Sequence, residues 1–137
     1  MKEIWCYISL FIICPTLIFL YSRYRCLNKN SFKDPLEHSI FLMLDGWSIT
    51  HLLFYMLAGY IFPNYFLLTT LLGISWELFE TYCGTYKPLW LSGWGNCIFT
   101  DKVDNEDWWY GKWSDIFMNT LGLTIGQYLK IGHIKIY

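Results

Sequence analysis

The chain has 137 residues, of which 55% are hydrophobic and only 15% are charged, and its formal net charge is −1. Soluble domains carry about 25% charged residues and disordered chains are more polar still, so disorder is excluded. The near-zero net charge gives no field that attracts nucleic acid, and we expect no nucleic-acid partner. The length favours one domain, residues 1–137, in a very apolar globule or a membrane.

Residues 4–22 form the first predicted membrane span, because no charged residue interrupts them. A helix that crosses a hydrocarbon core of about 30 Å needs about 20 residues, and membrane helices tolerate a proline such as Pro15. Small residues typical of a signal cleavage site are missing at its end. We expect an uncleaved anchor, with a removed signal as the alternative. A polar loop over 23–38 follows, in which Asp34 and Pro35 predict a helix start.

Three further apolar segments predict three more spans. Residues 39–62 form the second, the Pro63–Asn64 turn reverses the chain, and residues 65–83 form the third, antiparallel to the second. Residues 113–129 form the fourth. The segment 84–112 is irregular and rich in tryptophan, which favours a loop at the level of the lipid head groups. The sequence therefore predicts an all-α fold: a polytopic membrane helical bundle of about four spans, forming one domain.

The basic residues predict an orientation for this bundle. Residues 23–37 hold four Lys or Arg and residues 84–112 hold three, against one before the first span and two after the fourth. Positive charge favours the cytoplasmic face. We therefore expect both loops in the cytoplasm and both termini on the opposite side.

Cysteine usage predicts neither a zinc site nor a redox motif. The five cysteines are an odd number, and no two of them form a Cys-x-x-Cys pair. We expect most of them to be small apolar fillers. They stand at positions 6, 14, 26, 83 and 97.

Ionisable residues within the predicted spans are the strongest functional signal. Each costs about 2.5–3.5 kcal/mol in a membrane and normally faces the bundle interior. His51, Glu77, Glu80 and Asp115 lie in the spans, with Asp45 near the end of one. Glu77 and Glu80 are three residues apart and share a helix face. Two carboxylates on one face repel unless a cation, a proton or an imidazolium lies between them.

A second stripe of polar and small residues runs along the fourth span. Asp115, Asn119, Gly122 and Gly126 follow one another in steps of four, three and four residues. Glycines at such spacing let another helix approach closely, which would hold Asp115 and Asn119 against the third span. Interhelical hydrogen bonding without catalysis would also explain these polar residues.

Together these residues predict a polar pocket inside the bundle. Clustered carboxylate and amide oxygens are ligands for Ca²⁺ or Mg²⁺. His51, which forms an i, i+4 pair with Tyr55, suits a general base because imidazole titrates near neutral pH. A hard cation and a base close to the membrane interface suit chemistry on a phospholipid head group. A structural hydrogen bond is the alternative for His51.

The order of these residues resembles the core of the eukaryotic base-exchange phosphatidylserine synthases. The matching residues are His51, the sequence WELFE over 76–80, the sequence EDWW over 106–109, and Asp115 and Asn119 with Gly122 three residues later. The resemblance covers about residues 45–126. It implies a calcium-dependent transferase that exchanges the head group of a phospholipid for serine.

The resemblance also implies roles for individual residues. His51, Glu77 and Asp115 would be catalytic, and Trp108, Trp109 and Tyr55 would contact the substrate or the interface. A divalent cation, Ca²⁺ by resemblance, would be held by Glu77, Glu80, Glu106, Asp115 and Asn119. An endomembrane of the endoplasmic-reticulum type would be the location.

The small size and the Asp-x3-Asn-x2-Gly spacing are similar to VanZ-like membrane proteins as well. The second hypothesis is therefore a non-catalytic protein that binds a lipid or another amphiphile. A proton- or ion-coupled transporter also uses intramembrane acids, although a chain of 137 residues without an inverted repeat would need to dimerise. The sequence leaves the acceptor head group and a homodimer open.

Overall fold

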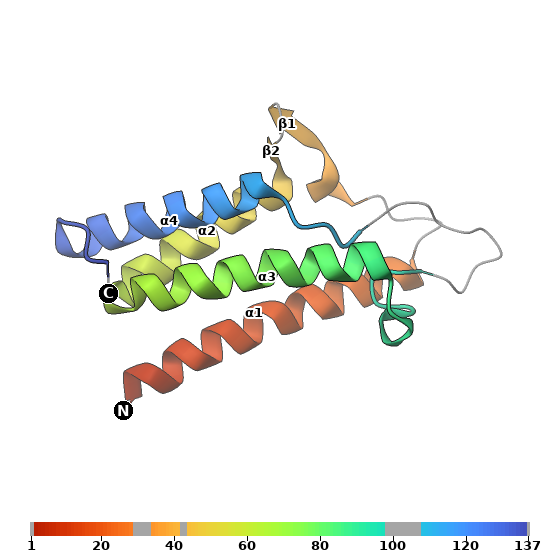
Figure 1. Ribbon diagram of the computed structural model, residues 1–137, viewed down its shortest axis with the longest axis horizontal. Coiled ribbons are helices and arrows are strands. Elements are labelled where there is room, and N and C mark those ends of the chain that lie inside the picture. The colour runs from red at the N-terminus through yellow and green to blue at the C-terminus, as the bar shows by residue number, and fades with distance from the viewer. Residues whose placement is uncertain (1, 29–33, 42–43, 98–107, 137) are drawn as a thin grey trace. The chain divides into compact units, whose positions relative to one another are not determined.

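The computed structural model describes residues 2–28, 34–41, 44–97 and 108–136. The fold is all-α, as the sequence predicts. The helices are α1 (Lys2–Leu27), α2 (Gly46–Ile61), α3 (Phe66–Tyr86) and α4 (Trp113–Ile131), with short 3₁₀ helices η1 (Pro35–Glu37), η2 (Pro63–Tyr65) and η3 (Leu89–Leu91) (Figure 1). Strands β1 (Ser39–Phe41) and β2 (Leu44–Asp45) pair antiparallel.

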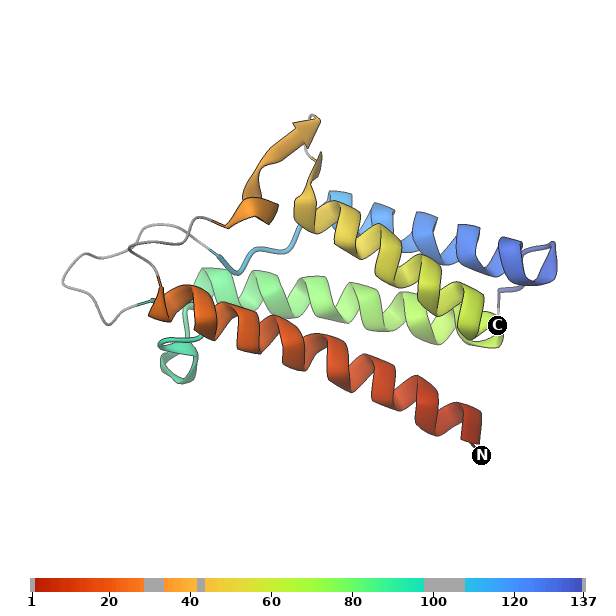
Figure 2. The ribbon, with the colours of Figure 1, turned by 180° about the vertical axis from the view of Figure 1, so that it is seen from behind.

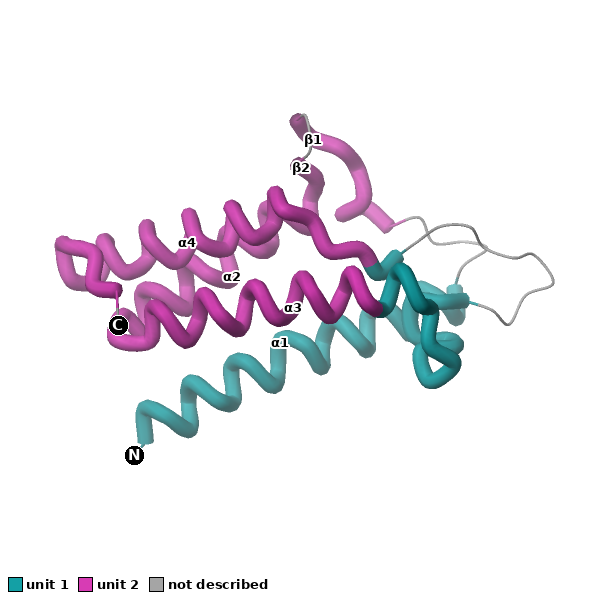
Figure 3. Tube along the Cα trace, viewed as in Figure 1, with its two compact units in different colours: residues 1–33, 83–109 teal, residues 34–82, 110–137 magenta. Residues whose placement is uncertain are grey.

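The described residues form two compact units, each built from segments distant in sequence (Figure 3). Unit 1 contains residues 1–33 and 83–109, and unit 2 contains residues 34–82 and 110–137. Unit 2 holds α2, most of α3 and α4. Unit 1 holds α1 and the tryptophan-rich segment after α3.

The predicted start of the second span at residue 39 is wrong, because residues 39–41 and 44–45 form the paired strands β1 and β2. The helix begins only at Gly46, where the Asp45 side chain caps it by accepting a hydrogen bond from Ser48 N at 2.9 Å. Such a cap satisfies a backbone donor that the first turn leaves unpaired. The predicted start at Asp34 and Pro35 is found, but it produces only the single turn of η1.

Helices α2 and α4 lie side by side in both views of the ribbon (Figures 1 and 2). The close approach predicted at Gly122 and Gly126 is confirmed, although their partner is α2 and not the third predicted span. A Cβ at Gly122 would overlap the carbonyl of Leu52, and one at Gly126 would overlap the carbonyl of Met56. Backbone therefore lies against backbone along this contact, as in small-x3-small packing.

Helix α3 follows α2 after the predicted turn at Pro63 and Asn64, with a bend of 112° between the two helical segments. Its Gly73 leaves room for the Tyr55 ring, whose hydroxyl would lie 2.8 Å from a Cβ there. Tyr55 itself packs with Phe66 and Leu123 in the buried apolar core of unit 2. The three helices thus meet around one core.

Gln127 of α4 is fully buried and hydrogen-bonded to two other segments. Its amide nitrogen donates to the carbonyl oxygens of Pro63 and Lys135, and its oxygen accepts from Lys135 N at 2.9 Å. One side chain therefore joins the turn between α2 and α3 to the segment that follows α4.

In unit 1, aromatic rings and a disulfide join α1 to the tryptophan-rich segment. Phe19 packs on Trp109 with ring centroids 5.1 Å apart, and Trp109 Nε1 donates to the carbonyl of Trp94 at 2.7 Å. Cys26 and Cys97 form a disulfide. The prediction that most of the five cysteines are apolar fillers therefore does not extend to these two, whereas Cys6, Cys14 and Cys83 are outside the disulfide.

One helix in the described part of the chain is by itself long and apolar enough to cross a membrane, namely α1. Helix α2 and the segment 63–86 pass the same criterion only when taken together, with the 112° bend between them. The structure thus supports one crossing helix by length and composition.

Replacing Gly126 with alanine should destabilise unit 2, because the new methyl group would overlap the Met56 carbonyl. Overpacking of this kind costs about 1–3 kcal/mol. Thermal unfolding in detergent measures the effect, with Thr120→Ala on the exposed face of α4 as the control. Equal unfolding temperatures for the two variants would show that the α2–α4 contact is not tight.

Candidate functional site

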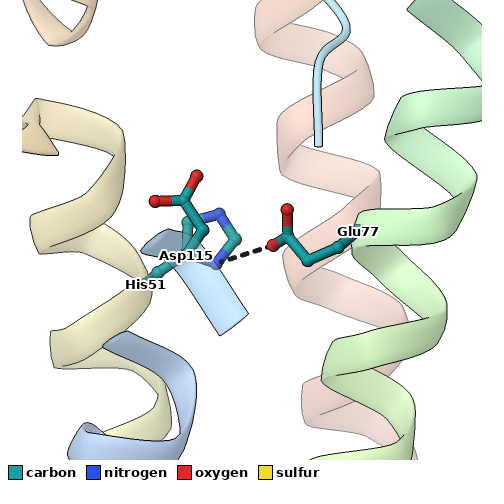
Figure 4. A group of neighbouring side chains, drawn as sticks. All are labelled: His51, Glu77 and Asp115. Atoms are coloured by element: carbon teal, nitrogen blue, oxygen red, sulfur yellow. Dashed lines mark ion pairs between the residues drawn. The ribbon is translucent and has the colours of Figure 1, made fainter. Parts of the chain in front are cut away.

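Three polar side chains from three helices converge in unit 2. His51 of α2, Glu77 of α3 and Asp115 of α4 each offer one ligand atom, and these atoms lie within 4.8 Å of one another (Figure 4). Only 2% of Glu77 and 2% of Asp115 is exposed. We call these three residues the triad. The predicted convergence of His51, Glu77 and Asp115 is therefore found in the structure.

His51 lies between an amide and a carboxylate. Its Nδ1 lies 2.8 Å from Asn119 Oδ1 and 3.5 Å from Glu77 Oε1, the ion pair that is dashed in Figure 4. An amide oxygen only accepts hydrogen bonds, so in this contact Nδ1 carries the proton. When the ring is neutral, its lone pair is then on Nε2, where it can accept a proton from a bound molecule. When the ring is protonated, it forms the ion pair with Glu77.

Two groups near the ends of α2 and α4 orient the carboxylates of the triad. The hydroxyl of Ser48 donates to Asp115 Oδ1, and the backbone N–H of Lys112 donates to Glu77 Oε2 at 3.1 Å. Gly111 makes the second contact possible, because a Cβ there would overlap the carbonyl of Glu77. Both carboxylates are thus held by hydrogen bonds while one oxygen of Glu77 stays available.

Among the described residues, two buried atoms at this site have no hydrogen-bond partner: Glu77 Oε1 and Asn119 Nδ2. Buried polar atoms are nearly always paired, so such an atom requires an explanation. Glu77 Oε1 is an acceptor, which a cation would satisfy with the carboxylate ionised, and Asn119 Nδ2 is a donor, which an oxygen of a ligand would satisfy. Two carboxylates and an amide are a suitable donor set for a hard divalent cation.

A cleft of about 540 Å³ lies in unit 2 beside the start of α4. Lys112 contacts both the triad and this cleft, because its backbone N–H donates to Glu77 while its side chain lines the cleft. We call this space the Lys112 cleft. Its lining consists of Glu37, Ser39, Leu44, Asp45, Tyr110, Gly111, Lys112, Trp113 and Ser114.

Charged groups form a compact network in the Lys112 cleft. The ammonium of Lys112 pairs with Asp45 and lies 4.4 Å from the centre of the Tyr110 ring, whose hydroxyl donates to Asp45 Oδ2 at 3.3 Å. Burial alone would raise the pKa of Asp45, but the Lys112 ammonium and the hydrogen bonds from Ser48 outweigh it and lower the pKa. Burial and the neighbouring Asp45 charge raise the pKa of Tyr110.

The lowered pKa of Asp45 predicts a pH dependence of stability. Replacing Lys112 with methionine should reduce the free energy of unfolding at neutral pH, because the buried Asp45 carboxylate loses its partner. Since the pKa is lower in the folded protein, the wild-type advantage is present above the unfolded value of about 3.9. It is lost as the pH falls through the folded pKa.

Unfolding of both proteins between pH 7 and pH 3 measures this advantage. Lys2→Met, which changes an exposed lysine, is the matched control. A difference between wild type and Lys112→Met that stays constant down to pH 3 would contradict the pairing.

The other predicted site residues lie elsewhere or beside the triad. Asn119 contacts His51, as described. Glu80 lies about one turn from Glu77 on α3 and is not in the converging group found among the described residues. Tyr55 belongs to the apolar core. Glu106 lies outside the described residues, so its predicted role as a ligand stays a prediction.

Trp108 and Trp109, predicted to contact the substrate or the interface, are buried in unit 1. Only 1% of Trp109 is exposed, and its ring packs on Phe19. The Trp108 ring lies against Tyr21 with centroids 6.3 Å apart. In the structure these two rings support the fold of unit 1 and present little surface to a ligand.

Sequence reasoning missed Ser48 and Lys112. Each stands three residues before a member of the triad, Ser48 before His51 and Lys112 before Asp115. That spacing puts Ser48 on the His51 face of α2, and Lys112 is at the N-cap of α4. The i−3 spacing is the signal that could have identified both.

Comparisons of the chain with known proteins found no relative. No family model, no curated protein and no solved structure matches the chain.

Proposed function

We propose that the protein is an integral membrane enzyme that transfers phospholipid head groups with the help of a divalent cation. The reaction would be serine base exchange of the phosphatidylserine synthase type, in an endomembrane such as the endoplasmic reticulum. The observation that carries the proposal is the convergence of His51, Glu77 and Asp115 around a buried carboxylate oxygen without a hydrogen-bond partner among the described residues.

Exposed apolar side chains on every long helix support a multi-pass membrane protein. Soluble proteins rarely expose apolar patches larger than a few hundred Å², whereas lipid-facing helices present such side chains as a rule. Outward-facing residues include Ile12 and Leu17 of α1, Leu53 and Leu57 of α2, Leu67 and Leu71 of α3, and Phe117 and Leu129 of α4.

The triad fits the proposed cation, which we expect to be Ca²⁺. Glu77 and Asp115 would hold it and Asn119 would contribute from the adjacent turn. Glu106 remains a proposed ligand, whereas Glu80, which is outside the converging group found among the described residues, is no longer proposed as one. When bound, the cation would supply positive charge to the phosphate. Asn119 also keeps His51 in the tautomer whose Nε2 can accept a proton.

His51 would then act as the general base. Its Nε2 takes the proton from the hydroxyl of the acceptor, whose oxygen attacks phosphorus and forms the new phosphorus–oxygen bond. The bond to the departing head-group alcohol breaks, and that alkoxide takes the proton back from His51. The transfer balances without an oxidant or a hydrolytic step, and general acid–base catalysis of this kind contributes about 10²–10⁴-fold.

The Lys112 cleft would give the polar head group a place beside the triad. Lys112 connects the two, since its backbone orients Glu77 and its ammonium lines the cleft. A head group carries a phosphate anion, and an ammonium is a common phosphate ligand in proteins. The acceptor and the lipid phosphate could therefore approach Glu77 and Asp115 from this side.

Reconstitution tests the proposal directly. The full chain is placed in liposomes of phosphatidylcholine and phosphatidylethanolamine with millimolar calcium and isotope-labelled serine. Labelled phosphatidylserine is expected by mass spectrometry, and a chelator should abolish it. If labelled serine, ethanolamine and choline all fail to enter lipid, the enzyme proposal is lost. A lipid that copurifies and stays unchanged would then identify the non-catalytic, VanZ-like lipid binder.

A further inference from the structure

The disulfide between Cys26 and Cys97 is part of a set of contacts that fix the end of α1 to residues 93–97. Arg25 is buried and directs its guanidinium at the carbonyl of Gly95, 3.5 Å away. Arg23 donates to the carbonyl of Gly93 at 3.1 Å and lies over the Trp94 ring. The covalent bond is thus embedded in a folded arrangement and is not an accidental contact of exposed thiols.

We propose that the side of the membrane that carries Cys26 and Cys97 faces an oxidising compartment outside the cytoplasm. Disulfides persist in such compartments and are rare where glutathione and thioredoxin keep thiols reduced. Helix α1, the one described helix able to cross a membrane by itself, would then have its N-terminal end in the cytoplasm. This orientation is the reverse of the one that the basic residues predict.

The disulfide also limits how the chain between its two cysteines crosses the membrane. Two bonded sulfur atoms lie on one side, so residues 27–96 cross an even number of times. Helix α2 and the segment 63–86 meet the length and hydropathy criterion only together. They therefore cross as a hairpin of two passes or not at all, which excludes a single broken span.

Chain connectivity extends the argument to the triad. Residues 28–45 contain five charged residues, Lys29, Lys33, Asp34, Glu37 and Asp45, and hold no apolar stretch long enough to cross. The start of α2 is therefore on the same side as Cys26. His51 lies within the first two turns of α2, nearer to that side than to the other. A calcium site on that side would face an extracellular-type compartment. Calcium sites there typically have modest affinity, with dissociation constants of about 10⁻⁴–10⁻³ M.

The contacts within the structure account for part of the charge bias that opposes this orientation. Seven basic residues lie in the two loops against three near the termini. Among the described basic residues, Arg23 and Arg25 bind carbonyl groups of residues 93–95, Lys112 pairs with Asp45, and Lys130 near the C-terminus lies over the Tyr60 ring. Without these four, the counts are four in the loops and two near the termini, a smaller excess than seven over three.

Counting reactive thiols in cells tests whether Cys26 and Cys97 are disulfide-bonded there. Cells that express the full chain are treated with a permeant alkylating reagent, and the denatured protein is then labelled with polyethylene-glycol maleimide with and without prior reduction. Two thiols, those of Cys26 and Cys97, should become labelled only after reduction. If the reagent blocks all five cysteines before reduction, the disulfide does not form in the cell and the proposal is overturned.

A pair of introduced cysteines tests the orientation. Leu89→Cys and Glu3→Cys, both at exposed positions, are made separately in a chain with Cys6→Ala, Cys14→Ala and Cys83→Ala. An impermeant maleimide applied to intact cells, or to the lumenal side of inverted vesicles, should label Leu89→Cys. Glu3→Cys should be labelled only after the membrane is permeabilised. The opposite pattern, with the disulfide still present on a non-reducing gel, would overturn the orientation.

Discussion

Glu77→Gln should abolish the stabilisation that a divalent cation gives to the folded protein. The substitution keeps the size of the side chain and the acceptor for Lys112 N–H, but removes the charge of the oxygen that has no hydrogen-bond partner among the described residues. A ligand present at 100 times its dissociation constant stabilises by about 2.7 kcal/mol. Unfolding temperatures of the purified protein, recorded with a chelator and with calcium, magnesium or manganese, measure that stabilisation.

Glu80→Gln is the matched control for this experiment. It makes the same chemical change on the same helix, about one turn from the triad. We expect Glu80→Gln to keep the cation-dependent shift in unfolding temperature. If the two variants behave alike, or if the wild type shows no shift with any cation, the triad is not a cation site.

His51→Gln should lower the rate of head-group transfer about 10²–10⁴-fold, the contribution of a positioned general base. Cation-dependent stabilisation should persist, because Glu77 and Asp115 remain. The measurement pairs the liposome assay with thermal unfolding of the same preparation. A variant that loses the cation shift together with turnover would make His51 a ligand of the metal and contradict its role as the base.

Asn119→Ala offers a second measure of the same mechanism. Asn119 contacts His51 Nδ1 and would act through it by holding the tautomer, so it is a positioning residue. Its loss should lower the turnover number more than it changes the Michaelis constant for the acceptor. Tyr55→Phe, in the apolar core on the same helix as His51, is the control and should leave both nearly unchanged.

Helix periodicity was sufficient to identify the residues of the site but not all of their neighbours. The cost of burying an ionisable group in an apolar span is enough to single out His51, Glu77 and Asp115. Spacing then places Asp115 and Asn119 on one face. Spacing does not tell which helix that face contacts. In the structure α2, and not the third predicted span, packs against Gly122 and Gly126.

The boundary of the second helix could not be read from hydropathy, because residues 39–45 are as apolar as the helix that follows. An Asp45 side chain that caps the helix end and a hairpin that pairs Ser39 with Asp45 decide it. The disulfide could not be predicted from the sequence either, because Cys26 and Cys97 are 71 residues apart and match no known cysteine spacing. Contacts between distant segments are the part of the fold that local patterns do not encode.

Gln127 gives the bundle a mechanical link. Its amide binds the turn at Pro63 and the extended segment at Lys135 at the same time. An ionised glutamate at this position would have no donor for the two carbonyl oxygens but would still accept from Lys135 N, so the bond to Pro63 would be lost and the attachment of Lys135 weakened. The turn between α2 and α3 and the segment after α4 are therefore anchored by the same amide, and one substitution at Gln127 would weaken both attachments.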